Sequence, residues 1–291
     1  MSLLEALFLA VVQGVAEFLP ISSSGHLAIF KNVFGVNTDT GLLYDVMLHV
    51  GTLAAVFIVY WKDIWELIRE GFAIIGAALS NTFKFITNLF SKEKKEYTQV
   101  INTPYRRFVM LVIISTIPTG ILGIVLSDVI ENASTTLLVP GICLLITSLL
   151  LYISEKVPEK DFNESNTSYG KGLIIGIVQG FATLPGISRS GSTITAGLFC
   201  GLERSFAVKY SFILSIPAIL GAAVLELKDF NEISVGSVEL VNYIVGMVVA
   251  AVVGYICIRW LLVLVKNKKF KYFSIYCFAV GIIAIVAHFV I

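Results

Sequence analysis

Long apolar runs separated by short polar stretches dominate the chain. A helix that spans a bilayer needs roughly 20 mostly apolar residues. Six runs reach this length, and we predict a membrane-spanning helix in each: 42–61, 108–126, 136–153, 206–227, 241–265 and 272–291. The pattern therefore predicts an all-α polytopic membrane protein.

Two further segments, 3–34 and 172–202, have a different pattern. Each holds an apolar half, a break rich in proline, glycine and serine, and a second apolar half. Each is too interrupted for one spanning helix and too short for two. Because non-helical backbone at membrane depth persists only where it is buried in protein or lines a wet cavity, we predict a re-entrant helix–loop–helix hairpin in each segment.

The breaks in these two segments are related in sequence. Residues 12–26 read VQGVAEFLPISSSGH, and residues 178–192 read VQGFATLPGISRSGS. The two stretches align without a gap and share Val-Gln-Gly-x-Ala and Ile-Ser-x-Ser-Gly. Polar groups at membrane depth face protein or water, so we expect the function to lie where the two breaks meet.

The basic residues indicate the topology, because cytoplasmic loops carry the excess of Lys and Arg. Four loops hold 17 of the 21 basic residues, and we assign them to the inside: 62–107, 154–171, 203–209 and 266–271. Three spans then separate the hairpins, and an odd number inverts the second half.

We therefore predict two inverted-topology repeats in one membrane domain, residues 1–153 and 154–291. Each repeat consists of a re-entrant hairpin plus three transmembrane helices. The hairpins enter from opposite faces and meet near the midplane, and both termini lie outside.

An insertion at about 63–107 interrupts the symmetry of the repeats. Apolar residues recur there at helical spacing among charges, at Ile64, Leu67, Ile68, Phe72, Ile75 and Leu79. This pattern is typical of an amphipathic helix on a membrane surface, here the inner one. The alternative is a seventh span through 72–90, which would break the inversion.

Composition agrees with a membrane protein and narrows the partners. The chain is 57% hydrophobic and 14% charged, and its mean hydropathy is +0.88, more than a soluble core requires. The net charge of +1 argues against a nucleic-acid partner, since binding a polyanion needs a basic face.

The first break carries a carboxylate. Gln13 and Glu17 are four residues apart, so on a helix they share one face and can form a hydrogen-bond network or hold a hard cation. A charged group at membrane depth is costly unless it is partnered. The alternative interpretation is that Glu17 only caps the serine-rich turn.

Hydroxyl groups follow the carboxylate. Ser22, Ser23 and Ser24 supply hydroxyls and free backbone N–H groups where a second short helix begins, and such a helix start is typical of an anion site. His26 follows Ser23 by three residues, which allows imidazole and hydroxyl to act as base and nucleophile. A hydrogen-bonded buried histidine without a catalytic role is the alternative.

The second break supplies a guanidinium. Arg189 lies in a loop rich in glycine and hydroxyl groups, between Ser188 and Ser190 and close to Thr193, at the start of a helix. The planar guanidinium suits phosphate oxygens, and the loop N–H groups and the helix dipole add to the attraction. The alternative is that Arg189 simply neutralises Glu17. Acid, base, hydroxyls and an anion cradle together predict phosphoryl chemistry.

The two breaks resemble a known pair of motifs. EFLPISSSGH at 17–26 and PGISRSGST at 185–193 are similar to the two signature motifs of the undecaprenyl-diphosphate phosphatases of the BacA/UppP type, the bacitracin-resistance family. The resemblance covers the whole chain. It implies hydrolysis of undecaprenyl diphosphate to undecaprenyl phosphate and inorganic phosphate in the bacterial cell membrane, which recycles the lipid carrier of cell-wall synthesis.

Carried over residue by residue, the resemblance implies a catalytic pair, Ser23 and His26, with Glu17 as the acidic group. It implies a diphosphate cradle of Ser188, Arg189, Ser190 and Thr193, with Arg189 also catalytic, and we add Gln13, Ser22 and Ser24 to the substrate-binding residues. The family motif has Glu or Gln, three residues, then Glu. Here the first position is Gln13, so Glu17 is the principal candidate ligand for a divalent cation, Mg²⁺ or Ca²⁺.

We predict in-line attack on the terminal phosphorus by Ser23, with His26 as base. The alternatives are that His26 is itself the nucleophile or that it activates water. The charge count brings the first hairpin in from outside, so we expect the site to open to the outer face. Membrane lipid is an expected partner, and a homodimer is left open.

A different class of function is also compatible with the pattern. Inverted repeats with broken helices at the midplane are typical of alternating-access carriers, so a transporter or flippase of a prenyl phosphate lipid is the alternative. The grouped reactive side chains exceed what recognition of a head group requires. A purely structural membrane subunit is disfavoured, because ionisable residues at depth mark functional sites.

Overall fold

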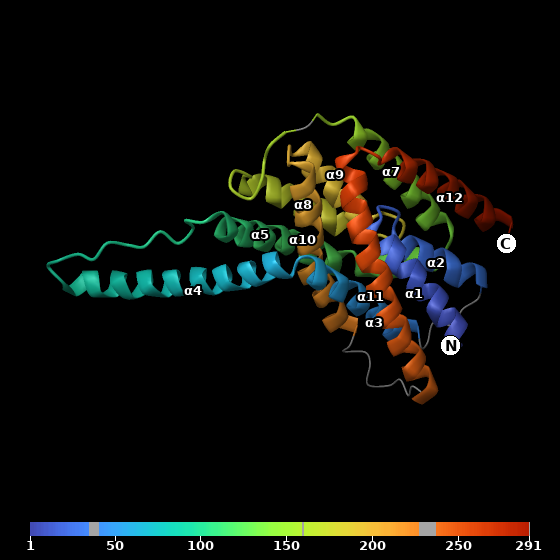
Figure 1. Cartoon of the computed structure of the whole chain (residues 1–291), viewed down its shortest axis with the longest axis horizontal. Coiled ribbons are helices and arrows are strands. Elements are labelled where there is room, and N and C mark those ends of the chain that lie inside the picture. Colours follow the sequence, from blue (N-terminus) through green and yellow to red (C-terminus); the bar gives the residue numbers. More distant parts are fainter. Residues whose placement is uncertain (35–40, 159, 227–236, 291) are drawn as a thin grey trace.

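The computed structural model describes residues 1–34, 41–158, 160–226 and 237–290, and most of these residues are helical. The helices are α1 (Leu3–Phe18), α2 (Ser23–Phe34), α3 (Gly41–Val59), α4 (Trp61–Phe90), α5 (Pro104–Val125), α6 (Ser127–Ser134), α7 (Leu138–Glu155), α8 (Tyr169–Phe181), α9 (Arg189–Phe199), α10 (Arg204–Glu226), α11 (Ser237–Lys266) and α12 (Lys271–Val290). Most of them pack into one body, from which α4 projects as a long arm (Figure 1). The predicted all-α class is confirmed.

Among the described residues, five helices are long and apolar enough to cross a membrane: α5, α7, α10, α11 and α12. They coincide with five of the six predicted spans. The sixth, predicted at 42–61, corresponds to α3, whose described residues Leu43–Val59 pass this test together with α4 across the bend between them. The protein is therefore a polytopic membrane protein.

The two segments with polar breaks form helix–loop–helix hairpins, as predicted. The first hairpin is α1 and α2, and the second hairpin is α8 and α9. The longest of these four helices, α1, has 16 residues. At 1.5 Å per residue it extends about 24 Å, short of the roughly 30 Å of a bilayer core. The membrane face from which each hairpin enters stays a prediction.

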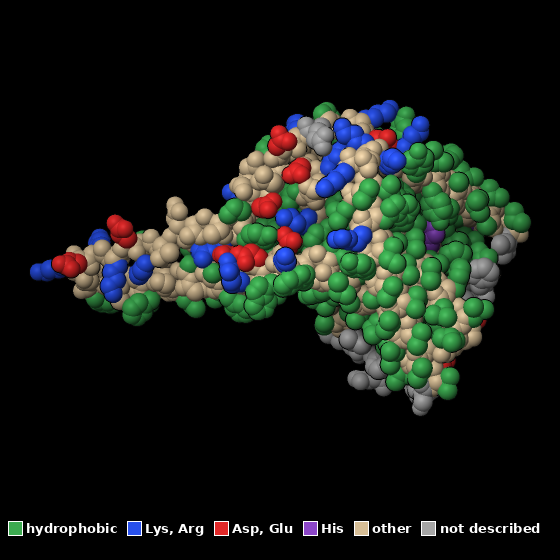
Figure 2. Space-filling view, in the orientation of Figure 1, with side chains coloured by type: hydrophobic (Ala, Val, Ile, Leu, Met, Phe, Trp, Pro, Cys, Tyr) green, Lys and Arg blue, Asp and Glu red, His purple; other side chains and the backbone are tan. Residues whose placement is uncertain are grey.

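Helix α4 is one continuous helix of 30 residues, and it begins where the chain bends by 87° from α3. Exposed apolar side chains form a stripe along it at spacings of three or four: Trp61, Trp65, Ile68, Phe72, Ile75, Leu79, Phe83, Ile86 and Phe90. Apolar side chains gather along the lower edge of the arm, and charged ones lie above them and at its tip (Figure 2).

The opposite face of α4 is covered by the chain itself. Asn81 exchanges two hydrogen bonds with the backbone of Thr98, and Asn88 does the same with Lys95. The amphipathic helix predicted for the insertion is thus present. By itself α4 is not among the helices apolar enough to cross a membrane, which argues against a seventh span. Its place on the inner surface stays a prediction.

Pairs of helices from the two halves pack along one another. Helix α1 lies along α11, α8 lies along α5, and α7 pairs with α12. In the predicted repeats, α1 corresponds to α8, and α5 corresponds to α11. The contact of α1 with α11 is then the counterpart of the contact of α8 with α5. This pairing supports the predicted inverted repeats, which themselves stay a prediction.

Close packing of α8 on α5 depends on a glycine. A Cβ added to Gly176 would lie 2.2 Å from the carbonyl oxygen of Ser115. We expect Gly176→Ala to push the helices apart and to lower the free energy of unfolding by about 2–3 kcal/mol. Thermal unfolding of the purified protein in detergent measures this loss. Gly120→Ala on α5 is the matched control, because an added Cβ there meets no atom within 4 Å; equal melting temperatures for the two variants contradict the prediction.

Candidate active site

The tips of the two hairpins meet inside the body. A Cβ added to Gly25 in the first hairpin would lie 2.7 Å from the Cα of Gly186 in the second. Gly186 has φ +97°, a left-handed conformation that suits glycine, and its own Cβ would clash with the carbonyl of Pro140 at 2.3 Å. The predicted meeting of the two breaks is confirmed, and small residues make this close approach possible.

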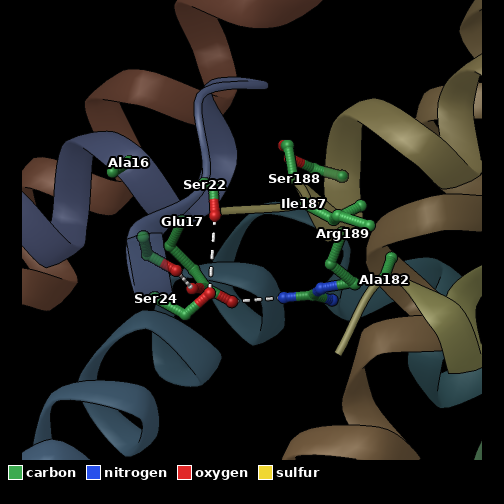
Figure 3. Close-up of a pocket in the computed structure, with 10 residues that line it drawn as sticks. Ala16, Glu17, Ser22, Ser24, Ala182, Ile187, Ser188 and Arg189 are labelled. Atoms are coloured by element: carbon green, nitrogen blue, oxygen red, sulfur yellow. Dashed lines mark hydrogen bonds and ion pairs between the residues drawn. The ribbon is translucent and has the colours of Figure 1, made fainter. Parts of the chain in front are cut away.

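Glu17 is the centre of a buried cluster at this junction, with 6% of its surface exposed. Its Oε2 accepts hydrogen bonds from Gln13 Nε2 at 3.0 Å and from Ser23 Oγ at 2.6 Å. Its Oε1 accepts a hydrogen bond from Arg189 Nη2 in an ion pair that joins the hairpins. Figure 3 shows Glu17 and Arg189 approaching from opposite sides.

A small cavity of about 30 Å³ lies beside this ion pair, enough to hold water. Residues of both hairpins line it: Ala16, Glu17, Ser22, Ser23, Ser24, Ala182, Ile187, Ser188, Arg189 and Ser190. The carboxylate and the guanidinium therefore face one small polar space between the hairpins.

Arg189 has a hydrogen-bond donor left for a bound anion. Its Nη1 is buried and has no hydrogen-bond partner among the described residues. Nearby, Ser188 caps α9 by accepting a hydrogen bond from the backbone N–H of Gly191 at 3.1 Å. Ser190 Oγ lies 3.3 Å from Ser188 Oγ. The guanidinium thus stands beside a helix N-terminus whose dipole favours negative charge.

Thr193, also predicted in the cradle, lies behind these residues. Its hydroxyl donates to the carbonyl of Arg189 at 2.8 Å and lies 2.6 Å from Ser211 Oγ on α10. It is not among the residues that line the cavity. In this arrangement Thr193 ties α9 to α10.

The turn before α2 positions the first hairpin's hydroxyls. Ser22 has φ 69°, a left-handed conformation. Its Oγ accepts a hydrogen bond from the backbone N–H of Gly25 at 3.2 Å and lies 3.4 Å from Ser24 Oγ. Ser23 follows directly, with its hydroxyl turned to Glu17.

The structure does not join His26 to Ser23. His26 is buried, and its Nδ1 lies 2.8 Å from the carbonyl oxygen of Ser22. Its Nε2 lies 2.8 Å from the hydroxyl of Tyr276 on α12. Neither His26 nor Tyr276 lines the cavity. The sequence has no signal for Tyr276, which is a single aromatic residue within an apolar span.

Residues 6–283 match the model of a protein family described as the bacitracin resistance protein BacA. The chain belongs to this family. An undecaprenyl-diphosphatase of Methanosphaera stadtmanae is 41% identical over 286 residues, covering 98% of each chain. Proteins with the same name from Halothermothrix orenii and Alkaliphilus metalliredigens are 38% and 41% identical, again over 98% of each chain. The predicted resemblance is confirmed.

The residues around Glu17 can be tested for their fit to a divalent cation. Among the described residues, no group of three or more His, Cys, Asp and Glu side chains could hold an ion. Gln13 Oε1, next to Glu17, is nevertheless buried without a hydrogen-bond partner in this part of the chain. A carboxylate and a carboxamide oxygen are ligands that Mg²⁺ and Ca²⁺ prefer, and Mg²⁺ is often held by one or two carboxylates plus substrate phosphates. The residues fit a cation that arrives with a diphosphate.

Proposed function

We propose that the protein hydrolyses undecaprenyl diphosphate to undecaprenyl phosphate and inorganic phosphate. One observation carries the proposal: the hydroxyl of the half-buried Ser23 bonds to Glu17, beside Arg189 with its unpartnered Nη1. These groups lie at the junction of two helical hairpins in a membrane protein. Membership in the BacA family and relatives named undecaprenyl-diphosphatase over 98% of their length support the same substrate.

The reaction proceeds by in-line attack. The diphosphate displaces Glu17 from Arg189, and Ser23 Oγ bonds to the terminal phosphorus while its proton passes to Glu17 Oε2. The bond from that phosphorus to the bridging oxygen breaks, and undecaprenyl phosphate leaves. Water then hydrolyses the phosphoserine and releases phosphate. Arg189 and the N-terminus of α9 stabilise the charge on the equatorial oxygens.

This scheme gives Glu17 the role of base, in place of the predicted role of His26. The reason is that Ser23 bonds to Glu17 at 2.6 Å, whereas His26 bonds to Ser22 and Tyr276. The rival scheme has His26 as nucleophile or as activator of water. Trapping a phosphoenzyme and locating the phosphate on a hydroxyl or on an imidazole separates the two.

The test of the function is phosphate release from a prenyl diphosphate by the purified protein. We expect steady release of inorganic phosphate from undecaprenyl diphosphate. If no prenyl diphosphate is cleaved, the transporter alternative gains support. Movement of a labelled prenyl phosphate between the leaflets of proteoliposomes then measures that activity.

We further propose that Glu17 and Gln13 hold a divalent cation that accompanies the diphosphate. The cation would neutralise phosphate charge, because the single positive charge of Arg189 neutralises only part of it. Removal of divalent ions with a chelator is expected to lower the rate of phosphate release by about 10-fold or more, and Mg²⁺ or Ca²⁺ is expected to restore it. An unchanged rate in excess chelator contradicts the cation proposal.

We propose that the site opens to the outer face of the cell membrane. Ser24 is exposed, and so is Ser165 in a loop assigned to the inside. With Cys200, the half-buried native cysteine, replaced by serine, a cysteine at position 24 is expected to react with an impermeant reagent from outside, and one at 165 only after lysis. Labelling of position 24 only after lysis overturns the orientation.

A further inference from the structure

His26 is held from two sides by groups outside the cavity. Its Nδ1 lies 2.8 Å from the carbonyl oxygen of Ser22, and since a carbonyl only accepts hydrogen bonds, Nδ1 carries the proton and donates. In the neutral imidazole, Nε2 then accepts from the hydroxyl of Tyr276, 2.8 Å away. The two rings are nearly parallel, with an interplanar angle of 6° and centroids 5.6 Å apart. His26 thus links α12 to the turn that precedes α2.

The carbonyl that His26 binds belongs to a backbone conformation that serine rarely adopts. At φ 69°, Ser22 lies in the left-handed region, which costs free energy for a residue with a Cβ. The next residue is Ser23, whose hydroxyl donates to Glu17 Oε2 at 2.6 Å. A contact that stabilises Ser22 in this conformation therefore keeps Ser23 aimed at the carboxylate.

Contacts of the residues on either side of Tyr276 hold this part of α12 in place. On one side of it, Ser274 and Ser148 on α7 each donate to the other's carbonyl at 2.8 Å. On the other side, Cys277 Sγ lies 3.7 Å from the carbonyl of Pro20 in the first hairpin. These contacts fix α12 against both α7 and the turn on either side of Tyr276.

We propose that Tyr276 is a positioning residue: its hydroxyl holds His26, and through His26 it holds the left-handed turn that presents Ser23 to Glu17. A hydroxyl suits this role, because it can donate to a neutral imidazole and accept from a charged one. Tyr276 itself does not line the cavity. The inference rests on the proposed phosphatase function.

The first test is the steady-state kinetics of Tyr276→Phe. This change removes a single oxygen atom from a residue that is 42% exposed. We expect kcat to fall about 10-fold and KM to stay within about twofold, by analogy with the hydrogen-bond partners that orient metal-bound histidines. Tyr276→Leu is expected to match Tyr276→Phe. Tyr272→Phe, one turn earlier and 69% exposed, is the control and is expected to behave as wild type.

Two outcomes of these kinetics overturn the proposal. One is a wild-type kcat for Tyr276→Phe, whether or not Tyr276→Leu is impaired, because the ring alone then suffices. The other is a rise in KM with unchanged kcat, which indicates substrate contact. Absence of phosphate release by the wild-type protein itself overturns the proposed function instead.

A spectroscopic test is independent of activity. In protein labelled with ¹⁵N at histidine, the Nε2 resonance of His26 is assigned by its loss in His26→Ala. We expect this resonance to shift in Tyr276→Phe and to stay in place in Tyr272→Phe, because only the first change removes its hydrogen-bond donor. An unmoved resonance in Tyr276→Phe shows that the hydroxyl does not hold His26, and the proposal fails.

Discussion

Purified protein with Arg189→Ala is expected to release phosphate about 10³-fold more slowly than the wild type. Arg189 is the cation at the junction of the hairpins, and its unpartnered Nη1 stands beside the N-terminus of α9. Without it, the charge that develops on the equatorial phosphate oxygens loses its main stabilising group. Phosphate release from undecaprenyl diphosphate measures the loss.

Two variants make this result specific. Arg189→Lys keeps the charge but lacks the planar fork, so we expect it to recover only part of the rate. Arg259→Ala removes the same side chain from an exposed position on α11 and is expected to leave the rate unchanged. Full activity of Arg189→Ala refutes its role in the site.

Glu17→Gln is the second change with a large expected effect, a fall in the rate of about 10³-fold. The carboxylate accepts hydrogen bonds from Ser23, Gln13 and Arg189 together. A carboxamide cannot take the proton of Ser23. Its NH₂ group would also replace one of the two acceptor oxygens, and so would face either Arg189 or the donors Gln13 and Ser23. Phosphate release per folded molecule is the measurement, with thermal unfolding recorded in parallel because the change leaves Arg189 without its counter-charge.

Glu5→Gln is the matched control for this change. Glu5 lies on the same helix, in the capping box at the start of α1, and glutamine also fills that position of a capping box. We expect wild-type turnover from it. Equal activities of the two glutamine variants are incompatible with Glu17 as the base.

Local pattern predicts much of this fold, for identifiable reasons. The five long spans follow from runs of apolar residues, because a backbone in lipid must satisfy its hydrogen bonds within a helix. The breaks at 19–22 and 182–188 follow from proline, glycine and serine, which end helices. Helix α4 follows from apolar residues at spacings of three and four. Each of these signals lies within one short segment.

The candidate site is only partly predictable in the same way. The repeated motif indicates that Glu17 and Arg189 meet, because a buried carboxylate and a buried guanidinium are each costly without a partner. The spacing of Ser23 and His26 predicts a bond between them, and the structure instead bonds Ser23 to Glu17. The left-handed conformation of Ser22 turns the hydroxyl and the imidazole to different neighbours.

The sequence by itself determined the helical class, the two broken hairpins and the polar residues at their tips, because hydrophobic length and turn chemistry act within a few neighbouring residues. Only the tertiary structure decided which polar groups touch. The partner of His26 is Tyr276, 250 residues along the chain, and the pair exists because α12 packs on α7 beside the first hairpin. Such contacts depend on how helices cross, and no local spacing encodes that crossing.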